Sequence, residues 1–326
     1  MFRPTWLFTL ALSTLAATGG LMAAINSPAP AEAYTDLRYK ARKVLGLEKY
    51  WLPLPDATKV AGLVPIACPS VADTIVVVTG GQSNATNVIP TLHTAGPQVS
   101  VWFEGACYPA ADPILGANNS SGSLWSLMGD KLATATGKPV LLINGGLGGT
   151  QYADWNDTRS GYLAALTRRI ETARAAGYEI DLALWHQGES DALIERDRNV
   201  IRTELSTLSE KLLDAMPEAP LYMFQTTKCI GALRANGVEE VRAIQADVVQ
   251  AHPRMVLGMN TDTLGNDYRW DTCHFNSQGR AEIVRQVVPA LVGLLDGRIP
   301  DPPEPGPAAI EPGPADAMVS LSSSSG

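Results

Sequence analysis

Short apolar runs rich in β-branched residues alternate with longer helical patterns over most of this 326-residue chain, beginning at Thr74. This alternation is typical of a parallel sheet with helices on both faces. Strands are predicted at residues 74–79, 99–103, 139–143, 182–186, 221–225 and 255–259, and helices at 124–136, 162–176, 194–216, 238–252 and 278–295. Gly137 and Gly177 directly follow the first and second of these predicted helices, where a helix stop is needed. We therefore expect one three-layer α/β/α domain, residues 71–297, with a mostly parallel sheet of about five or six strands.

The two ends of the chain differ from this body. Residues 1–33 contain Arg3, an apolar stretch over residues 6–24 and the small-x-small sequence Ala31-Glu32-Ala33, which together predict a secretion signal. An uncleaved membrane anchor is the alternative. Residues 34–70 are expected to form an arm that packs on the domain, and the Pro- and Ser-rich residues 298–326 a disordered tail. The sequence thus predicts an exported protein, secreted or periplasmic.

The charge of the chain excludes one class of partner. Its formal net charge of −8 argues against a basic face for nucleic acid. The composition, 45% apolar and 18% charged, is that of an ordinary globular protein with a sizeable core.

Export makes the four cysteines, Cys68, Cys107, Cys229 and Cys273, candidates for two disulfides. Four cysteines allow three pairings. Cys229 and Cys273 both fall near predicted strand ends on one edge of the sheet, which favours that pair. Their spacing does not match a zinc site, and we predict no metal.

A serine stands at the end of the first predicted strand. Gly81-Gln82-Ser83-Asn84 follows the run 74–79 directly, and binding crevices of open α/β sheets lie at the carboxyl ends of strands. A serine hydroxyl becomes a good nucleophile only beside a base. Of the four histidines, His274 is the best candidate because Asp271, three residues earlier, can fix its tautomer.

A second requirement for acyl chemistry is a set of donors for a developing oxyanion. The glycine-rich run 144–150 follows another predicted strand and can bring backbone N–H groups close to a substrate. Gln187 offers a side-chain amide as a further donor. The run lacks the lysine of a phosphate-binding P-loop, although a plain flexible turn is the alternative.

Four ordered blocks resemble the SGNH hydrolase superfamily, and within it the sialate O-acetylesterase-like group and carbohydrate esterase family six. The resemblance extends over about residues 74–295 and implies the SGNH, flavodoxin-like fold. The blocks are Gly80-Gly81-Gln82-Ser83-Asn84, Gly148-Gly149-Thr150 with Trp155, His186-Gln187-Gly188-Glu189-Ser190, and Asp271-Thr272-Cys273-His274.

The resemblance implies a role for each block. Ser83 would be the nucleophile, His274 the base and Asp271 its partner, with Glu189 as an alternative or supporting acid. The N–H groups of Ser83 and Gly149 and the Gln187 amide would form the oxyanion hole. The predicted substrate contacts are Asn84, Thr150, Trp155 and His186, the last with a structural role as an equal alternative.

The sequence therefore predicts a serine esterase that removes acetyl groups from carbohydrates without a cofactor. Two alternatives stay open: transfer of the acetyl group to a polysaccharide, and a glycan-binding module without catalysis. Trp102, Trp155 and Trp270 are candidates for stacking on sugar rings, with core packing the default for Trp102. Nothing in the sequence identifies the sugar.

Overall fold

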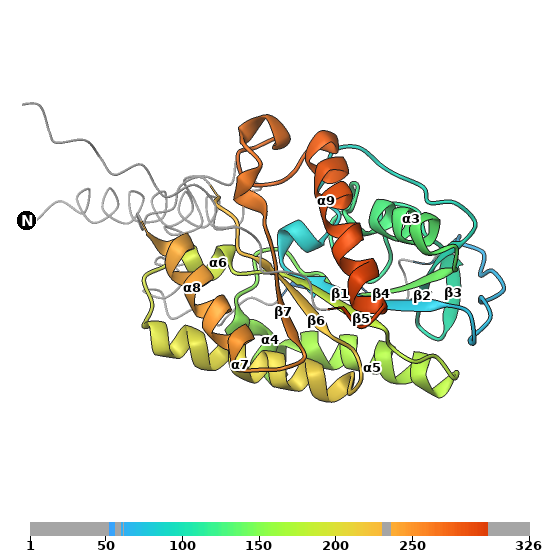
Figure 1. Ribbon diagram of the computed structural model, residues 1–326, viewed down its shortest axis with the longest axis horizontal. Coiled ribbons are helices and arrows are strands. Elements are labelled where there is room, and N and C mark those ends of the chain that lie inside the picture. Colours follow the sequence, from blue (N-terminus) through green and yellow to red (C-terminus); the bar gives the residue numbers. More distant parts are fainter. Residues whose placement is uncertain (1–51, 56–59, 61, 230–235, 299–326) are drawn as a thin grey trace, which may run out of the picture.

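A seven-stranded sheet forms the centre of the structure (Figure 1). The computed structural model describes residues 52–55, 60, 62–229 and 236–298. The strands are β1 (Ile75–Gly81), β2 (Val99–Phe103), β3 (Ala106–Pro109), β4 (Val140–Asn144), β5 (Leu182–His186), β6 (Leu221–Gln225) and β7 (Met255–Asn260). Their order in the sheet is β3-β2-β4-β1-β5-β6-β7, and every neighbouring pair is parallel except β2 and β3. The predicted fold class is confirmed.

Alternate side chains of the strands enter two separate cores, as the two faces of a pleated sheet require. Val76 and Val78 of β1 belong to one core, whereas Ile75 and Val77 belong to the other. Both sets are buried, so this part of β1 is apolar on both faces.

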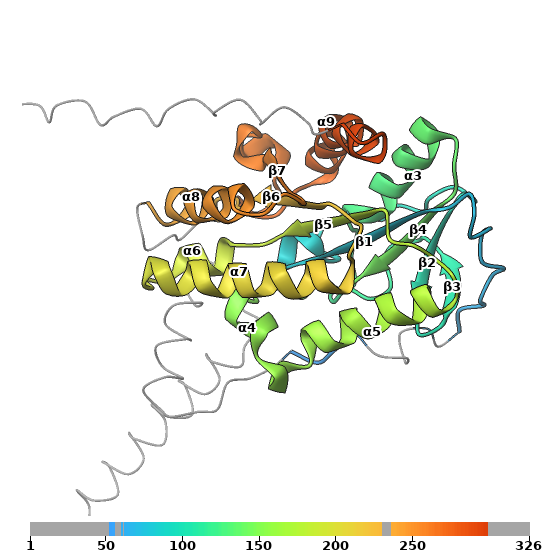
Figure 2. The same ribbon diagram turned by 60° about the horizontal axis from the view of Figure 1, so that its bottom comes forward.

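The helices form one layer on each face of the sheet (Figure 2). On one face, α3 (Trp125–Thr136) and α9 (Ser277–Leu295) supply residues such as Met128 and Ile283 to the core. On the other face lie α4 (Tyr152–Asn156), α5 (Tyr162–Ala175), α7 (Arg198–Ala215) and α8 (Gly237–Gln250). A further short helix, α6 (Glu189–Leu193), follows β5.

Two predictions about elements are wrong. The sheet has seven strands because β3, which was not among the predicted strands, turns back on β2 through Glu104 and Gly105, both with positive φ. Four residues ending in a proline carry little strand signal. The helix expected over residues 194–216 begins at Arg198, because the Asp197 side chain accepts the N–H groups of the first turn and caps it.

The described parts of the N-terminal arm contact the domain. The N–H of Ile66 donates to the carbonyl of Cys107 on β3, and Cys68 forms a disulfide with Cys107. The Leu52 carbonyl accepts a hydrogen bond from the Tyr162 hydroxyl. Among the described residues, no helix is long and apolar enough to cross a bilayer. The predicted signal, residues 1–33, and the tail from residue 299 lie outside the described residues.

The parallel strands bring five loops to one edge of the sheet. These loops follow β1, β4, β5, β6 and β7, and they carry all four of the blocks singled out in the sequence. A site assembled at this edge depends on the packing of the strands beneath it.

The stability of the sheet can be tested with matched leucines. Leu141 of β4 is fully buried, whereas Leu63 is 49% exposed. We expect Leu141→Ala to lower the free energy of unfolding by about 2–5 kcal/mol through lost burial and a cavity. Leu63→Ala should change it by no more than about 0.5 kcal/mol. Urea unfolding measures both, and equal losses would contradict the assignment of these side chains.

Candidate active site

Ser83 begins a short 3₁₀ helix, η2 (Ser83–Ala85), directly beyond the end of β1, and its side chain is partly exposed. Gly81 turns the chain here with φ +128°, and a Cβ at this position would lie 2.1 Å from the carbonyl oxygen of His186. Only glycine fits this approach. The Gln82 side-chain oxygen accepts the N–H of Ser190 at 3.0 Å. The serine turn is thereby fixed to the loop that follows β5.

The glycine-rich loop after β4 lies against Ser83. A Cβ built on Gly148 would lie 3.6 Å from the Cβ of Ser83, and the Gly148 N–H donates to Asn118 Oδ1 at 3.0 Å. Gly149 is exposed, with φ +71°. Within the described ranges, neither the Gly149 N–H nor the Ser83 N–H has a hydrogen-bond partner. Two open donors beside a serine can stabilise a developing oxyanion.

The Gln187 side chain lies behind this loop and is fully buried. Its Nε2 donates to the carbonyl of Thr150 at 3.1 Å, and its Oε1 accepts the indole N–H of Trp185 at 3.0 Å. The structure therefore does not show the direct oxyanion contact predicted from the sequence. It shows an amide that holds the residue following Gly149 in place.

His274 and Asp271 form a close pair in the loop before α9. Asp271 Oδ2 lies 2.6 Å from Nδ1 of His274, and Oδ1 accepts the His274 N–H at 2.6 Å and the Cys273 N–H at 3.1 Å. Burial alone would raise the pKa of Asp271, but the hydrogen bonds from His274 and Cys273 outweigh it and lower that pKa. Nδ1 is thus held as a donor to a carboxylate, which leaves Nε2 as the basic nitrogen.

A buried guanidinium supports the same loop. Arg269 donates to the carbonyl of Cys273 and, at 2.7 Å, to the hydroxyl of Thr227. It also pairs with Asp262 at 3.0 Å, and its Cζ lies 4.5 Å from the centre of the Phe275 ring. Burial lowers the pKa of Arg269, although the carboxylates around it, Asp262 first, oppose this. The loop that carries His274 is therefore tied to the segments that follow β6 and β7.

A disulfide joins Cys273 to Cys229, which follows β6. This is the pair that the sequence favoured, and Cys68 with Cys107 is the second bridge. Cys273 directly precedes His274, so the covalent link acts on the residue next to the imidazole.

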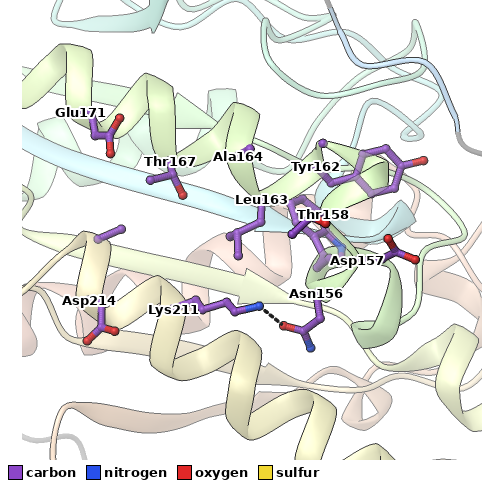
Figure 3. Close-up of a pocket in the computed structure, with 13 residues that line it drawn as sticks. Asn156, Asp157, Thr158, Tyr162, Leu163, Ala164, Thr167, Glu171, Lys211 and Asp214 are labelled. Atoms are coloured by element: carbon purple, nitrogen blue, oxygen red, sulfur yellow. Dashed lines mark hydrogen bonds between the residues drawn. The ribbon is translucent and has the colours of Figure 1, made fainter.

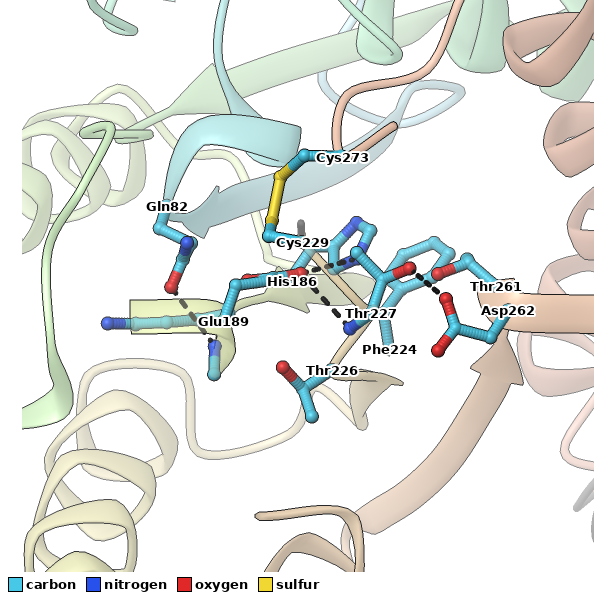
Figure 4. A network of polar contacts seen from close by, with 12 residues as sticks. Gln82, His186, Glu189, Phe224, Thr226, Thr227, Cys229, Thr261, Asp262 and Cys273 are labelled. Carbon is cyan, nitrogen blue, oxygen red and sulfur yellow. Dashed lines mark hydrogen bonds and ion pairs between the residues drawn. A yellow bond between two sulfur atoms is a disulfide. The ribbon is translucent and has the colours of Figure 1, made fainter. Parts of the chain in front are cut away.

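Glu189 is buried, and its side chain lies among the polar contacts of His186 and Thr227 (Figure 4). Its Oε1 accepts the N–H of Thr227 at 3.3 Å and lies 3.4 Å from Nε2 of His186. Burial raises the pKa of Glu189, and backbone N–H groups, Asn84 and the charge of His274 oppose it only in part. Burial also lowers the pKa of His186 to about 3, so that imidazole is neutral at physiological pH. The structure places Asp271, not Glu189, on Nδ1 of His274.

Three predicted substrate contacts need correction. Trp155 is 1% exposed and packs edge-on against Trp185 with ring centres 4.8 Å apart. Thr150 is buried and accepts the Trp155 indole N–H at 3.0 Å. His186 is fully buried and stacks on Phe224, which agrees with the structural role that the sequence left open for it. Each supports the floor of the site and offers no surface to a sugar. Asn84 is also buried, and its side chain interacts with the carboxylate of Glu189.

Several residues that shape the site were not singled out from the sequence. They are Gln82, Asn118, Thr227, Asp262 and Arg269. Gln82 lies inside a recognised block, so its position could have indicated a link to the neighbouring loop. The others lie between blocks, and only the folded chain brings them together.

A separate pocket of about 630 Å³ lies between α4, α5 and α7 (Figure 3). Its wall includes Asn156, Tyr162 and Lys211, and the Lys211 ammonium lies 3.4 Å from Asn156 Oδ1. None of Ser83, Asp271 and His274 lines it. The serine site is therefore a different region of the surface.

The sequence of the chain matches a family model over residues 76–292. The family is described as carbohydrate esterase, sialic acid-specific acetylesterase. This match covers the sheet from β1 into α9 and includes all four blocks. No curated protein matches the sequence.

Solved structures share the fold at low sequence identity. A protein from Arabidopsis thaliana is 16% identical, with a TM-score of 0.58 over 69% of this chain and 99% of that one. The structure of NanS is 16% identical, with a TM-score of 0.54 over 72% of this chain and all of NanS. A carbohydrate acetylesterase from Xanthomonas citri is 14% identical, with a TM-score of 0.50 over 69% of this chain and 57% of the other.

The two disulfides give a matched test of how the His274 loop is held. They join residues 39 and 44 positions apart, so removing either should cost a similar free energy of unfolding, about 2–4 kcal/mol. We expect Cys229→Ser with Cys273→Ser to slow labelling of Ser83 by a fluorophosphonate at least about tenfold, because a displaced base activates the serine poorly. Cys68→Ser with Cys107→Ser should leave the labelling rate unchanged when both variants are folded. Equal rates in the two double variants would contradict a role of Cys273 in holding the base.

Proposed function

The chain belongs to the family of carbohydrate esterases described as sialic acid-specific acetylesterases, and we propose that it removes acetyl groups from sugars with Ser83 as nucleophile. The observation that carries this proposal is the 2.6 Å contact between Asp271 and Nδ1 of His274 at the strand edge where Ser83 stands. This contact supplies the oriented base that a serine requires.

Acylation begins when Nε2 of His274 accepts the hydroxyl proton of Ser83. The serine oxygen then attacks the acetyl carbonyl carbon, and the carbonyl electrons move to its oxygen. When the tetrahedral intermediate collapses, the bond to the sugar oxygen breaks and His274 returns the proton to that oxygen. The sugar leaves with a free hydroxyl group, and Ser83 carries the acetyl group.

Deacylation uses the same residues with water in place of the sugar. His274 accepts a proton from water, the hydroxide attacks the acetyl-serine, and the proton returns to Ser83 as acetate leaves. Asp271 stabilises the imidazolium in both halves of the cycle, because its carboxylate stays ionised beside Nδ1.

The oxyanion is stabilised by the N–H groups of Ser83 and Gly149 in this proposal. Both lack a partner among the described residues, so no existing hydrogen bond must break when substrate binds. Gln187 acts indirectly: it does not contact the oxyanion, and its hydrogen bond to the Thr150 carbonyl holds the end of the glycine-rich loop. Removing a single oxyanion donor from a serine hydrolase typically lowers kcat about 10²–10³-fold.

Export of the protein is part of the proposal. The sequence of residues 1–33 motivates it, and two disulfides are consistent with an oxidising compartment. Acetylated carbohydrate is the proposed partner, and the charge of −8 is the reason to exclude nucleic acid.

Replacement of the nucleophile tests the reaction. We expect Ser83→Ala to lower acetate release from an acetylated sugar by at least about a thousandfold, because the covalent route is lost. His274→Ala should cause a loss of similar size, since the two residues act as one unit. The measurement is acetate release from peracetylated methyl xyloside and from O-acetylated N-acetylneuraminic acid. Parental rates in Ser83→Ala would reject the mechanism.

A second comparison identifies the carboxylate that serves His274. Asp271→Asn should reduce kcat by about 10³–10⁴-fold, because an amide stabilises neither the imidazolium nor the required tautomer. Glu189→Gln, which keeps the size and can still accept the Thr227 N–H, should reduce kcat by less than about tenfold. The reverse order of effects would show that Glu189 is the acid of the triad.

A further inference from the structure

We propose that Trp270 is the platform for the sugar half of the ester and thereby selects cyclic sugars over small alcohols. This inference rests on the proposed function of Ser83 and His274. The Trp270 side chain would determine which alcohol the enzyme prefers as the leaving group.

Trp270 is an unusual surface residue. It is 52% exposed, and it is the one aromatic ring among the exposed large hydrophobic side chains of the described residues. Trp102 and Trp155, the other candidates for sugar stacking, are 5% and 1% exposed and belong to the core. An exposed indole presents a large apolar face to water, and such faces commonly mark binding sites.

Trp270 lies beside His274, the proposed base, and contacts it through both ring and backbone. The Trp270 ring lies 5.8 Å from the imidazole of His274 with an angle of 21° between the planes, and the backbone N–H of Trp270 donates to the backbone carbonyl of His274 at 3.0 Å. One face of the indole therefore lies along the imidazole, and half of the residue surface is open to solvent.

The route of the proton determines which half of the ester lies near Trp270. Nδ1 of His274 is bound to Asp271, so Nε2 must deliver the proton to the leaving oxygen. That oxygen must come within hydrogen-bond reach of Nε2, about 2.6–3.2 Å. The carbonyl oxygen points instead to the N–H groups of Ser83 and Gly149. The alcohol thus lies on the Trp270 side, and the acetyl group lies on the side of the glycine loop.

The chemistry of a pyranose suits this surface. One face of the ring carries C–H bonds that pack on the electron-rich face of an indole, whereas a small aliphatic alcohol such as ethanol covers little of it. Selectivity from Trp270 should therefore appear as discrimination between a sugar ester and ethyl acetate.

The platform is held rigidly before substrate arrives. Arg269, the preceding residue, bonds to the carbonyl of Cys273, and its own carbonyl accepts the Asn276 side-chain N–H at 3.3 Å. Cys273 is joined to Cys229. Little conformational freedom is lost on binding, which favours affinity.

The kinetic test compares two esters. The sugar ester is whichever of peracetylated methyl xyloside and O-acetylated N-acetylneuraminic acid the parent hydrolyses faster, and the reference is ethyl acetate. Trp270→Ala should lower the ratio of kcat/KM for the sugar ester to that for ethyl acetate by about five- to tenfold, chiefly through KM. Trp270→Phe keeps a ring and should restore part of the ratio. Leu63→Ala removes a comparably exposed apolar side chain and should leave the ratio unchanged.

A support role for Trp270 would give a different result. If the indole only buttressed His274, Trp270→Ala would lower kcat for both esters equally and shift the pH dependence of both. That outcome, or an unchanged ratio, would overturn the proposal.

Binding without turnover separates this inference from the proposed function. In the Ser83→Ala background, saturation-transfer NMR should detect the same sugar ester, and adding Trp270→Ala should weaken its affinity by about five- to tenfold. This readout does not depend on hydrolysis, so an error about the nucleophile would leave it intact. Equal affinity in the two variants, or no binding of the ester to Ser83→Ala, would overturn the proposal.

Discussion

In the proposed mechanism, the chemistry of the site depends on the hydrogen bond between Asp271 and His274. A free imidazole could present either nitrogen to Ser83, but the carboxylate at 2.6 Å from Nδ1 leaves only Nε2 for proton transfer. The same carboxylate accepts two backbone N–H groups of its own loop, so it orders the loop and the tautomer together. The lowered pKa of Asp271 keeps it charged in both roles.

This pair is held by neighbouring segments that are far apart in the chain. Arg269 connects its loop to Thr227 and Asp262, and the Cys229–Cys273 bridge fixes the residue next to His274. The parallel sheet beneath brings the loops after β1, β4, β5, β6 and β7 to one edge. Side chains that take no part in the proposed reaction, such as Arg269, thus determine where His274 lies.

Much of the fold and of the site could be predicted from the sequence, because both depend on local patterns. Six strands were predicted from apolar runs that are buried on both faces, and the close spacing of Asp271 and His274 indicated their pairing. The edge strand β3 was missed because it has only four residues. It reaches β2 by a tight turn with two positive φ values, which the sequence pattern does not reveal. Trp155, Thr150 and His186 were placed too near the substrate, since a motif gives the position of a residue along the chain but not its depth. Gln187 bonds to the backbone of a distant loop at Thr150, and Arg269 bonds to the hydroxyl of Thr227, so neither contact can be read from a single segment.

In the proposed reaction, Ser83 carries the acetyl group between acylation and deacylation. The most direct test is mass spectrometry of peptides from enzyme quenched with acid during turnover of the sugar ester. We expect an acetyl group on the peptide that contains Ser83, and none on that peptide from Ser83→Ala. Acetylation at another residue that accumulates and decays at the rate of turnover, or full turnover with no acetyl-enzyme when the substrate is saturating and deacylation is the slower step, would contradict it.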